Sequence, residues 1–429
     1  MKKVNVFWFR RDLRLKDNRG LYEALTSKHA VFPIFIFDEN ILSQLENKED
    51  RRVDFIFQAL EKLNGFLIEK ESGIQYFYGK PLDIFKEILK EYHVENVFCN
   101  EDYEPSARKR DEEISEFLNS KEIGFESFKD QAIFAKDDIL KDDGNPYVVY
   151  TPYSKKWLET LNKKDFEPIS SEENIKNFLK YKPKNFGLQK IGFKKTTLNF
   201  QKPKIDLELI RNYDNTRNFP SEKGTSQLSV HLRFGTIGIR DLVSKIKNVN
   251  LVFLKELIWR EFFMQILWYY PKSSTENFRE KYDKIEWEND EKKFKRWCEG
   301  KTGFPIVDAG MRELNETGLM HNRVRMITAS FLIKDLLIDW KWGETYFAEK
   351  LLDYEQSSNV GNWQWVAGTG CDAAPYFRIF NPKSQQEKFD PDLKYCKKWL
   401  PEFDSEDYPQ PIVDHKKAST RTLEAYKML

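Results

Sequence analysis

The sequence predicts a parallel, Rossmann-like α/β domain followed by an all-helical domain. In the first third of the chain, short runs of β-branched and aromatic residues alternate with segments of helical length, as in a parallel sheet. Beyond Asp206 these strand signals fade and long amphipathic segments replace them. A chain of 429 residues is long enough to build two hydrophobic cores. We therefore expect an N-terminal α/β domain at 1–130, an interdomain linker at 131–205 and a helical domain at 206–429.

Four strands and one long helix support the α/β prediction. The strands are expected at Val4–Phe9, Val31–Phe37, Ile74–Tyr78 and Val94–Phe98. The helix, Arg52–Lys70, places its apolar residues on one face at helical spacing. No G-x-G-x-x-G follows the first strand, so a dinucleotide at the usual switch point is not expected. The basic turn after this strand, FRRDLRLKDN, fits either an anion site or a solvated, salt-bridged turn.

Composition and charge limit the partners and the compartment. Charged residues make up 32% of the chain but nearly cancel, leaving a net charge of +1, so any basic site for nucleic acid must be local. The four cysteines and five histidines are scattered, so we expect a reducing compartment and no metal site. The N-terminal apolar segment is too short for a signal peptide, and no run is long enough to span a bilayer. We therefore predict a cytoplasmic monomer that binds no membrane.

Two long helices are predicted in the C-terminal half. Leu251–Tyr270 and Arg323–Trp340 carry the strongest amphipathic patterns, and we expect Trp340 to end the second helix. Before them, the Lys-rich and Asn-rich stretch Asp165–Asp206 has weak periodicity, which indicates a surface linker.

The stretch Asp353–Pro382 has the highest density of chemically active side chains. It begins with two carboxylates and an Asn, and it also contains two Trp around one Gln, three closely spaced Gly, Asp372 and one arginine. Gly costs backbone entropy and the Trp N–H needs a partner, so this density favours a planar, partly polar ligand. A tight bend between two buried helices is the alternative. The segment GTSQLS, 224–229, has hydroxyl and amide donors at an expected helix start, which suits either a phosphate or a helix cap.

A set of motifs along the chain resembles those of the photolyase and cryptochrome family, in the family's order. They are WFRRDLRLKDN, YTPYSKKW, GTSQLSVHLRFG, ELIWREFF, GFPIVDAGMREL, MHNRVRM and NVGNWQWVAGTG with FRIFNP. The resemblance covers essentially the whole chain and is closest to class I cyclobutane pyrimidine dimer (CPD) photolyases. It implies an N-terminal α/β domain for an antenna chromophore and a helical domain that binds FAD. It further implies a deoxyribodipyrimidine photo-lyase, a carbon–carbon lyase that uses blue light to split dimers in UV-damaged DNA.

The resemblance also implies which residues bind FAD. The phosphate-binding set is Tyr213, Thr225, Ser226, Gln227, Leu228 and Ser229, whose donors suit a pyrophosphate. Arg325 and Asp353 match an ion pair beside the isoalloxazine, where a buried charge needs a partner. Asn359 matches the residue that faces the flavin N5. The second carboxylate of the motif is usually Asp in the family and is Glu355 here, so its extra methylene changes its reach towards the flavin.

Two further groups of residues follow from the resemblance. Trp363, Trp340 and Trp287 match a relay that passes electrons to photoexcited oxidised FAD. Residues expected against a flipped-out dimer are Glu256, Trp259, Asn322, Met326, Trp365 and Arg378. Indole suits both tasks because it is oxidisable and has a wide face for stacking. Catalytic roles are expected for Glu256, Asn359 and the three relay tryptophans, while Lys155, Arg323 and Arg378 are candidate phosphate contacts.

Two alternatives share these motifs, a cryptochrome-type blue-light sensor and a (6-4) photolyase. Trp365 and the short segment after the core favour repair over signalling. Asn322 and Met326 favour cyclobutane dimers over (6-4) products. The antenna chromophore stays open between a folate, a deazaflavin and a second flavin.

Overall fold

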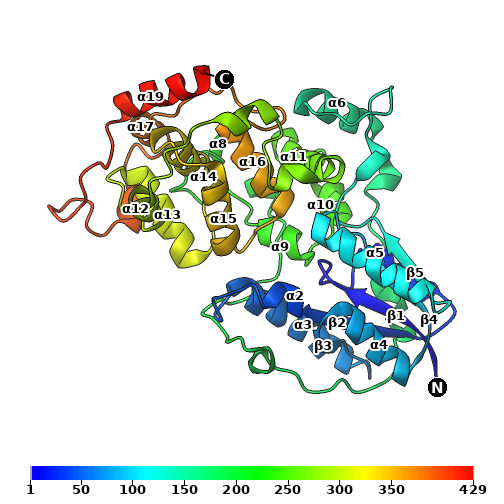
Figure 1. Cartoon of the computed structure of the whole chain (residues 1–429). Helices are drawn as coiled ribbons and strands as arrows, with labels where there is room; N and C mark the ends of the chain where they lie inside the picture. Colours follow the sequence, from blue (N-terminus) through cyan, green and yellow to red (C-terminus); the bar gives the residue numbers. More distant parts are fainter. Residues whose placement is uncertain (1, 429) are drawn as a thin grey trace. The chain divides into compact units, whose positions relative to one another are not determined.

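The computed structural model describes residues 2–428, which divide into two compact units (Figure 1). Unit 1 contains the chain up to Ala135, Thr160–Ile205 and Gln227–Asn248. Unit 2 contains Lys136–Glu159, Asp206–Ser226 and the chain from Val249 onwards. The chain therefore passes between the units several times, and the domain bounds expected from the sequence stay a prediction.

Unit 1 is built on a five-stranded parallel sheet in the order β3-β2-β1-β4-β5. The strands are β1 (Lys3–Phe9), β2 (Val31–Asp38), β3 (Gln75–Gly79), β4 (His93–Asn100) and β5 (Gly124–Phe128). The four predicted strands are confirmed. The prediction missed β5 because this edge strand, GFESF, exposes Glu126 and Ser127 and so lacks a continuous apolar run.

Helices connect the strands of unit 1 by crossovers. They are α1 (Arg19–Thr26), α2 (Glu39–Leu42), α3 (Arg51–Ile68), α4 (Pro81–Glu91) and α5 (Pro105–Asn119), with α9 (Ser229–Phe234) and α10 (Ile239–Ile246) added from later in the chain. The chain runs outward from β1 to β3 and then crosses back to β4, which is the doubly wound pattern. At the centre of the sheet, Val6 pairs with Phe32 on one side and Val97 on the other.

The basic turn after β1 is a buried network of ion pairs. Arg10 lies 2.5 Å from Asp111, and Arg14 lies 2.5 Å from Asp130. The other oxygen of Asp130 lies 2.5 Å from Arg240. Because these guanidinium charges are balanced by nearby carboxylates, the structure favours the salt-bridged turn over the anion site. The turn was expected to be solvated, but these side chains are at most 16% exposed.

Unit 2 is helical. Its longest helix is α11 (Leu251–Tyr269), and the helices that carry most of the predicted site are α14 (Asn322–Ser330), α15 (Trp340–Lys350) and α16 (Gln356–Ala367). The others are α6 (Tyr150–Thr160), α7 (Leu207–Arg211), α8 (Tyr213–Thr216), α12 (Glu291–Cys298), α13 (Pro305–Thr317), α17 (Pro382–Phe389), α18 (Lys394–Trp399) and α19 (His415–Lys427). The predicted helix Leu251–Tyr270 is thus confirmed, and α6 shows that the expected linker contains regular structure.

The predicted helix Arg323–Trp340 is wrong in its C-terminal half. α14 ends at Ser330, a π-helical turn follows at Phe331–Asp335, and Leu337 has a left-handed φ of 51°. Asp339 then caps α15, so Trp340 begins a new helix. The helical spacing of apolar residues suggested one continuous helix because the residues after the π-helical turn are also apolar and buried in the core. The apolar pattern therefore extends past the end of α14.

Helix α19 is anchored to this π-helical turn. His415 Nδ1 lies 2.5 Å from Asp335 Oδ1, and the Thr422 hydroxyl donates to the Lys334 carbonyl oxygen at 2.5 Å. Buried Lys334 donates from Nζ to the Ala367 carbonyl oxygen at the end of α16. The turn therefore connects α14, α16 and α19.

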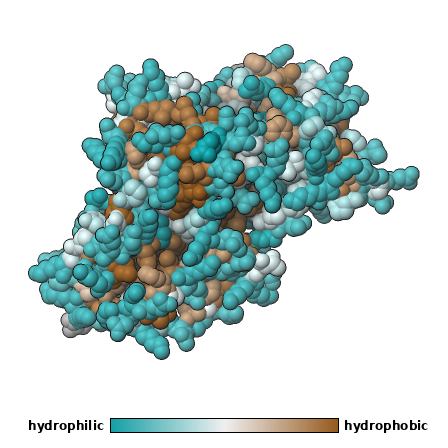
Figure 2. All heavy atoms as spheres, turned by 180° about the vertical axis from the view of Figure 1, so that it is seen from behind, coloured by the Kyte–Doolittle hydropathy of each residue, from teal (hydrophilic) through white to brown (hydrophobic). Residues whose placement is uncertain are grey.

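Hydrophilic residues cover most of the face shown in Figure 2, with apolar atoms gathered in patches. Within residues 2–428, no helix has the length and apolar character needed to cross a membrane.

Candidate functional site

Two ion pairs converge on the start of α16. Arg325 of α14 donates from Nη2 to both carboxylate oxygens of Asp353, at 3.0 and 2.9 Å. Arg260 of α11 donates to Glu355 Oε1 at 3.1 Å, and these two side chains are 10% and 7% exposed. The carboxylate of Glu355 therefore pairs with Arg260, which balances its charge within the protein. The ion pairs fix α11, α14 and α16 around one polar cluster.

Asn359, one turn into α16, has its side-chain amide held in one orientation. Its Nδ2 donates to Glu344 Oε1 at 2.9 Å and to the Glu344 carbonyl oxygen at 3.2 Å. Both partners are acceptors, so the NH2 group must face them. In the described chain the amide oxygen accepts no hydrogen bond, which leaves it for a ligand. Burial raises the pKa of the Glu344 carboxyl, while the bond from Asn359 opposes the rise.

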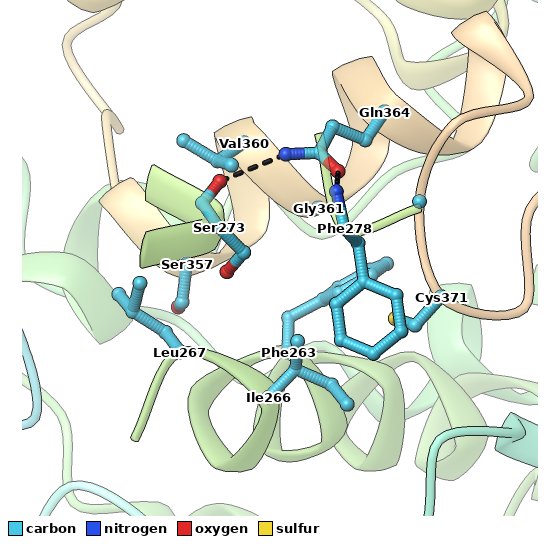
Figure 3. Close-up of a pocket in the computed structure, with 11 residues that line it drawn as sticks. Phe263, Ile266, Leu267, Ser273, Phe278, Ser357, Val360, Gly361, Gln364 and Cys371 are labelled. Atoms are coloured by element: carbon cyan, nitrogen blue, oxygen red, sulfur yellow. Dashed lines mark hydrogen bonds between the residues drawn. The ribbon is translucent and has the colours of Figure 1, made fainter. Parts of the chain in front are cut away.

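Gln364, between Trp363 and Trp365, anchors α16 to the loop after α11. Its Nε2 donates to the carbonyl oxygens of Ser273 and Glu276 at 2.8 and 2.9 Å, and its Oε1 accepts from Phe278 N at 2.9 Å (Figure 3). This buried amide is therefore satisfied on both ends. Gln364 is among the residues that line a cavity of about 20 Å³, enough for one water. Figure 3 shows the residues that line this cavity.

Two glycines allow α16 to approach its neighbours closely. A Cβ at Gly361 would lie 2.2 Å from the Phe263 ring of α11, and a Cβ at Gly343 would lie 2.2 Å from Trp363. Both distances are far below van der Waals contact, so only glycine fits at these helix crossings. The position of Trp363 thus depends on Gly343 in α15.

The three predicted relay tryptophans lie on separate elements at graded depth. Trp363 and Trp340 are buried, at 3% and 1% exposure, while Trp287 is half-buried. Trp340 donates from its indole N–H to Asn277 Oδ1 at 2.8 Å. Trp340 and Trp363 belong to one hydrophobic core cluster, and Trp287 packs against this cluster. Trp363 also packs on Phe347 and on Trp297, whose ring centroids lie 5.0 and 6.3 Å away.

None of the predicted lesion-side residues is buried. Asn322 and Arg378 are exposed, and Glu256, Trp259, Met326 and Trp365 are half-buried. Glu256 and Trp259 lie one turn apart on α11, and Asn322 lies beside Met326 on α14, with Nδ2 4.0 Å from the sulfur. Polar and aromatic groups of the type a nucleobase needs are therefore accessible on α11, α14 and α16.

Glu256 has a partner that the sequence did not reveal. Arg217 Nη1 lies 2.5 Å from Glu256 Oε1, and its guanidinium lies over the Tyr213 ring, 5.2 Å from the centroid. Burial raises the pKa of Glu256, and Arg217 opposes the rise. Arg323, a predicted phosphate contact, instead donates to Asn218 at 2.8 Å and lies over Phe389.

His321 caps α14 and leaves one polar atom without a partner. Its Nδ1 accepts from Arg323 N at 3.2 Å, so the ring proton is on Nε2. Burial, together with the charges of Arg325 and Arg323, lowers the pKa of His321 to about 4, which keeps the ring neutral. In the described chain Nε2 is buried and makes no hydrogen bond. A buried donor of this kind requires an acceptor from a ligand or water.

The predicted phosphate-binding segment surrounds the start of α9. Gln227 has a left-handed φ of 54°, Leu228 is the N-cap residue without a side-chain cap bond, and the helix begins at Ser229. The boundary between the two units falls between Ser226 and Gln227. The expected helix start is confirmed. The N-cap residue of α9 makes no side-chain hydrogen bond to the helix, which counts against the helix-cap alternative.

Sequence reasoning missed Glu344, Arg217 and Arg260 as members of this site. Arg260 had a usable signal, because it is the one cation in the motif ELIWREFF. Arg217 and Glu344 had none, since their partners lie on other helices and meet them only through the fold.

Two family models match the chain. One, described as DNA photolyase, matches residues 5–172, and the other, described as the FAD binding domain of DNA photolyase, matches residues 253–406. The deoxyribodipyrimidine photo-lyase of Vibrio cholerae is 35% identical to this chain, with 99% of each chain covered.

Two solved structures agree with these matches. A bacterial class III photolyase from Agrobacterium tumefaciens aligns with a TM-score of 0.87 and 33% identity, over 100% of this chain and 98% of that one. An archaeal photolyase from Sulfolobus tokodaii, solved with two FAD molecules, aligns with a TM-score of 0.86 and 33% identity over 100% of both chains. The fold and site thus define a protein with an FAD-binding helical domain. The chain belongs to the photolyase and cryptochrome family.

Proposed function

We propose that this protein repairs cyclobutane pyrimidine dimers in UV-damaged DNA under blue light. The observation that carries the proposal is the accessibility of Glu256, Trp259, Asn322, Met326, Trp365 and Arg378 beside a polar cluster in the FAD-binding domain. The relatives described above include a deoxyribodipyrimidine photo-lyase and two photolyases.

The residues present fit FAD. Two ion pairs, one oriented amide and one unpaired ring N–H lie on the helices around the start of α16, and these groups suit a ring system with several hydrogen-bonding edges. When bound, reduced FAD supplies light-driven electron donation. We assign phosphate binding to Tyr213 and the segment Thr225–Ser229, and assign Arg325, Asp353 and Glu355 to the isoalloxazine.

Asn359 has the right polarity for a reduced flavin. Its Nδ2 is held by Glu344, so its amide oxygen is the atom left for the ligand. An acceptor matches the N–H that a flavin carries at N5 when reduced, whereas oxidised N5 would need a donor. Glu344 is thus a positioning residue for Asn359.

The lesion side reads a dimer that has been flipped out of the duplex. Trp259 and Trp365 offer stacking faces, and Glu256, held by Arg217, offers a carboxylate to the pyrimidine edge. Arg378 lies on the same exposed loop as Phe377, which is 65% exposed. Since the net charge is only +1, we expect binding to undamaged DNA to be weak and to weaken further with salt.

The test of repair is a chromatographic assay of thymine dimers in irradiated oligonucleotide, with chemically reduced enzyme, in light and in dark. Intact thymines should return only in light, and Trp259→Ala and Glu256→Ala should impair the return. Asn362→Ala is a control, because Asn362 is exposed on α16 and donates within its own helix. Failure on cyclobutane dimers with activity on (6-4) products would favour the (6-4) alternative. No repair of either would favour a light sensor.

The relay has its own test. Blue light with a thiol donor should reduce oxidised FAD in the parent protein, and Trp363→Phe should slow this reduction strongly. Trp297→Phe is the matched control, since Trp297 packs on Trp363 but is not part of the predicted relay. Repair from chemically reduced enzyme should survive both changes. If the two changes slow photoreduction equally, Trp363 has no special role in the relay.

We further propose that the protein acts as a monomer in the cytoplasm, which size-exclusion chromatography and cell fractionation test. For the antenna in unit 1, a folate, a deazaflavin and a second flavin remain alternatives, and the absorption spectrum of the purified protein before and after denaturation separates them.

A further inference from the structure

Tyr150 packs flat against Trp259, one of the predicted stacking residues. The two ring centroids lie 3.5 Å apart and the ring planes differ by 5°. Aromatic pairs usually prefer offset or edge-to-face arrangements, so a flat sandwich has to be held by other contacts. Trp259 also contacts Phe263, with centroids 5.5 Å apart and ring planes that differ by 29°, and Phe262, edge-on at 5.7 Å. Tyr150 itself is buried, whereas Trp259 stays half-buried despite these three contacts.

Tyr150 is fixed at both ends. Its backbone N–H, at the start of α6, donates to Asp372 Oδ2 at 3.0 Å. Its hydroxyl donates to the Lys255 carbonyl oxygen of α11 at 3.0 Å, one turn before Trp259. Asp372 has a left-handed φ of 37°, which is uncommon for a residue with a side chain. The ring therefore has little freedom to swing away from Trp259.

We infer that Tyr150 is a positioning residue for substrate stacking. It covers one face of the Trp259 indole, fixes the tilt of the ring and leaves the solvent-accessible part of the ring for a pyrimidine dimer. This inference rests on the proposed function, since it needs Trp259 to stack on the lesion. It accounts for Tyr150 in the motif YTPYSKKW and for Asp372 in the loop after α16, neither of which had an assigned task.

The alternative is that Tyr150 occupies the place of the substrate and must leave before a dimer can bind. The two hydrogen bonds argue against this, because departure would leave the Lys255 carbonyl oxygen and the hydroxyl to find new partners. The two readings predict opposite effects of removing the ring, which makes them separable by experiment.

The experiment measures binding of an oligonucleotide with one cyclobutane thymine dimer, against the undamaged oligonucleotide, by the full-length FAD-containing protein. Tyr150→Ala should weaken binding of the dimer about three- to tenfold, the range expected when one aromatic pair is lost. Binding of undamaged DNA should stay within about twofold of the parent. Tyr150→Phe, which keeps the ring, should recover most of the affinity, and Tyr147→Ala is a control tyrosine that does not contact Trp259.

A double-mutant cycle separates positioning from a general effect on folding. In a Trp259→Ala background, Tyr150→Ala should have almost no further effect on dimer affinity. The FAD-to-protein ratio and melting temperature of each variant report on folding. An equal loss in both backgrounds, an unchanged affinity, or tighter binding by Tyr150→Ala would each overturn the inference. If the parent itself shows no preference for the dimer, the proposed function fails, and the inference fails with it.

Discussion

Gly343→Ala tests whether the close approach of α15 to α16 sets the position of Trp363. The added methyl carbon would lie 2.2 Å from Cη2 of Trp363 and 2.5 Å from Cδ2 of Leu332. Both neighbours are buried, at 3% and 0% exposure, so neither side chain can move into solvent. Relief requires a shift of the indole or of one helix.

The magnitude follows from two opposing terms. Overpacking a core by one methyl group costs about 1–3 kcal/mol, and replacing Gly by Ala inside a helix returns about 0.5–1 kcal/mol. With the middle of each range, the net change is about 1 kcal/mol of lost stability, which lowers the melting temperature of a unit of this size by about 2–4 °C. Displacement of Trp363 should also slow photoreduction of bound FAD.

Thermal melts followed by circular dichroism and by release of flavin fluorescence measure both effects. Gly65→Ala is the matched control, because a Cβ at this exposed position of α3 has no neighbour within 4 Å. It should raise stability by about 0.5–1 kcal/mol. If Gly343→Ala melts at or above the parent temperature and photoreduces at the parent rate, the packing argument for Trp363 is refuted.

Three further changes test the charged groups. Arg217→Gln removes the cation that opposes the burial-induced rise in the pKa of Glu256. The acid limb of the pH–rate profile for dimer repair should therefore move to higher pH. An unmoved acid limb would show that Glu256 does not set this limb. The hydrogen bond to Asp335 raises the pKa of His415, so this contact stabilises the protein fully below the ordinary His pKa and is lost as pH rises through the raised value. His415→Gln should therefore lower the melting temperature at about pH 6 more than at about pH 9, and an equal effect at both would contradict this. Asn359→Asp places a second carboxyl beside the Glu344 carboxylate and should change the spectrum of the photoreduced flavin, which an identical spectrum would disprove.

Local pattern was enough for the layout of unit 1 and for much of the helical unit. Apolar runs marked β1, β2 and β4, because strands that are mostly buried on both faces have few polar positions. The aromatic residues of β3 marked this edge strand although it is partly exposed. Edge strand β5 and the break between α14 and α15 escaped the same reasoning. The edge strand is too exposed to form an apolar run, and buried residues at 336–338 continue the helical stripe without a helix.

For the site, the sequence alone determined which residue types are present and which family motifs contain them. It predicted Arg325, Asp353, Asn359 and the two tryptophans of α16 as site residues, because they lie in short motifs that resemble those of the family. Which atoms face each other was decided only by tertiary structure. Glu344 orients Asn359 across a helix crossing, Arg217 reaches Glu256 from 39 positions earlier in the chain, and Tyr150 lies against Trp259. The residues in each of these contacts lie at irregular distances along the sequence, so no helical or strand periodicity predicts the contact. The contacts form only when the helices pack against each other at close crossings.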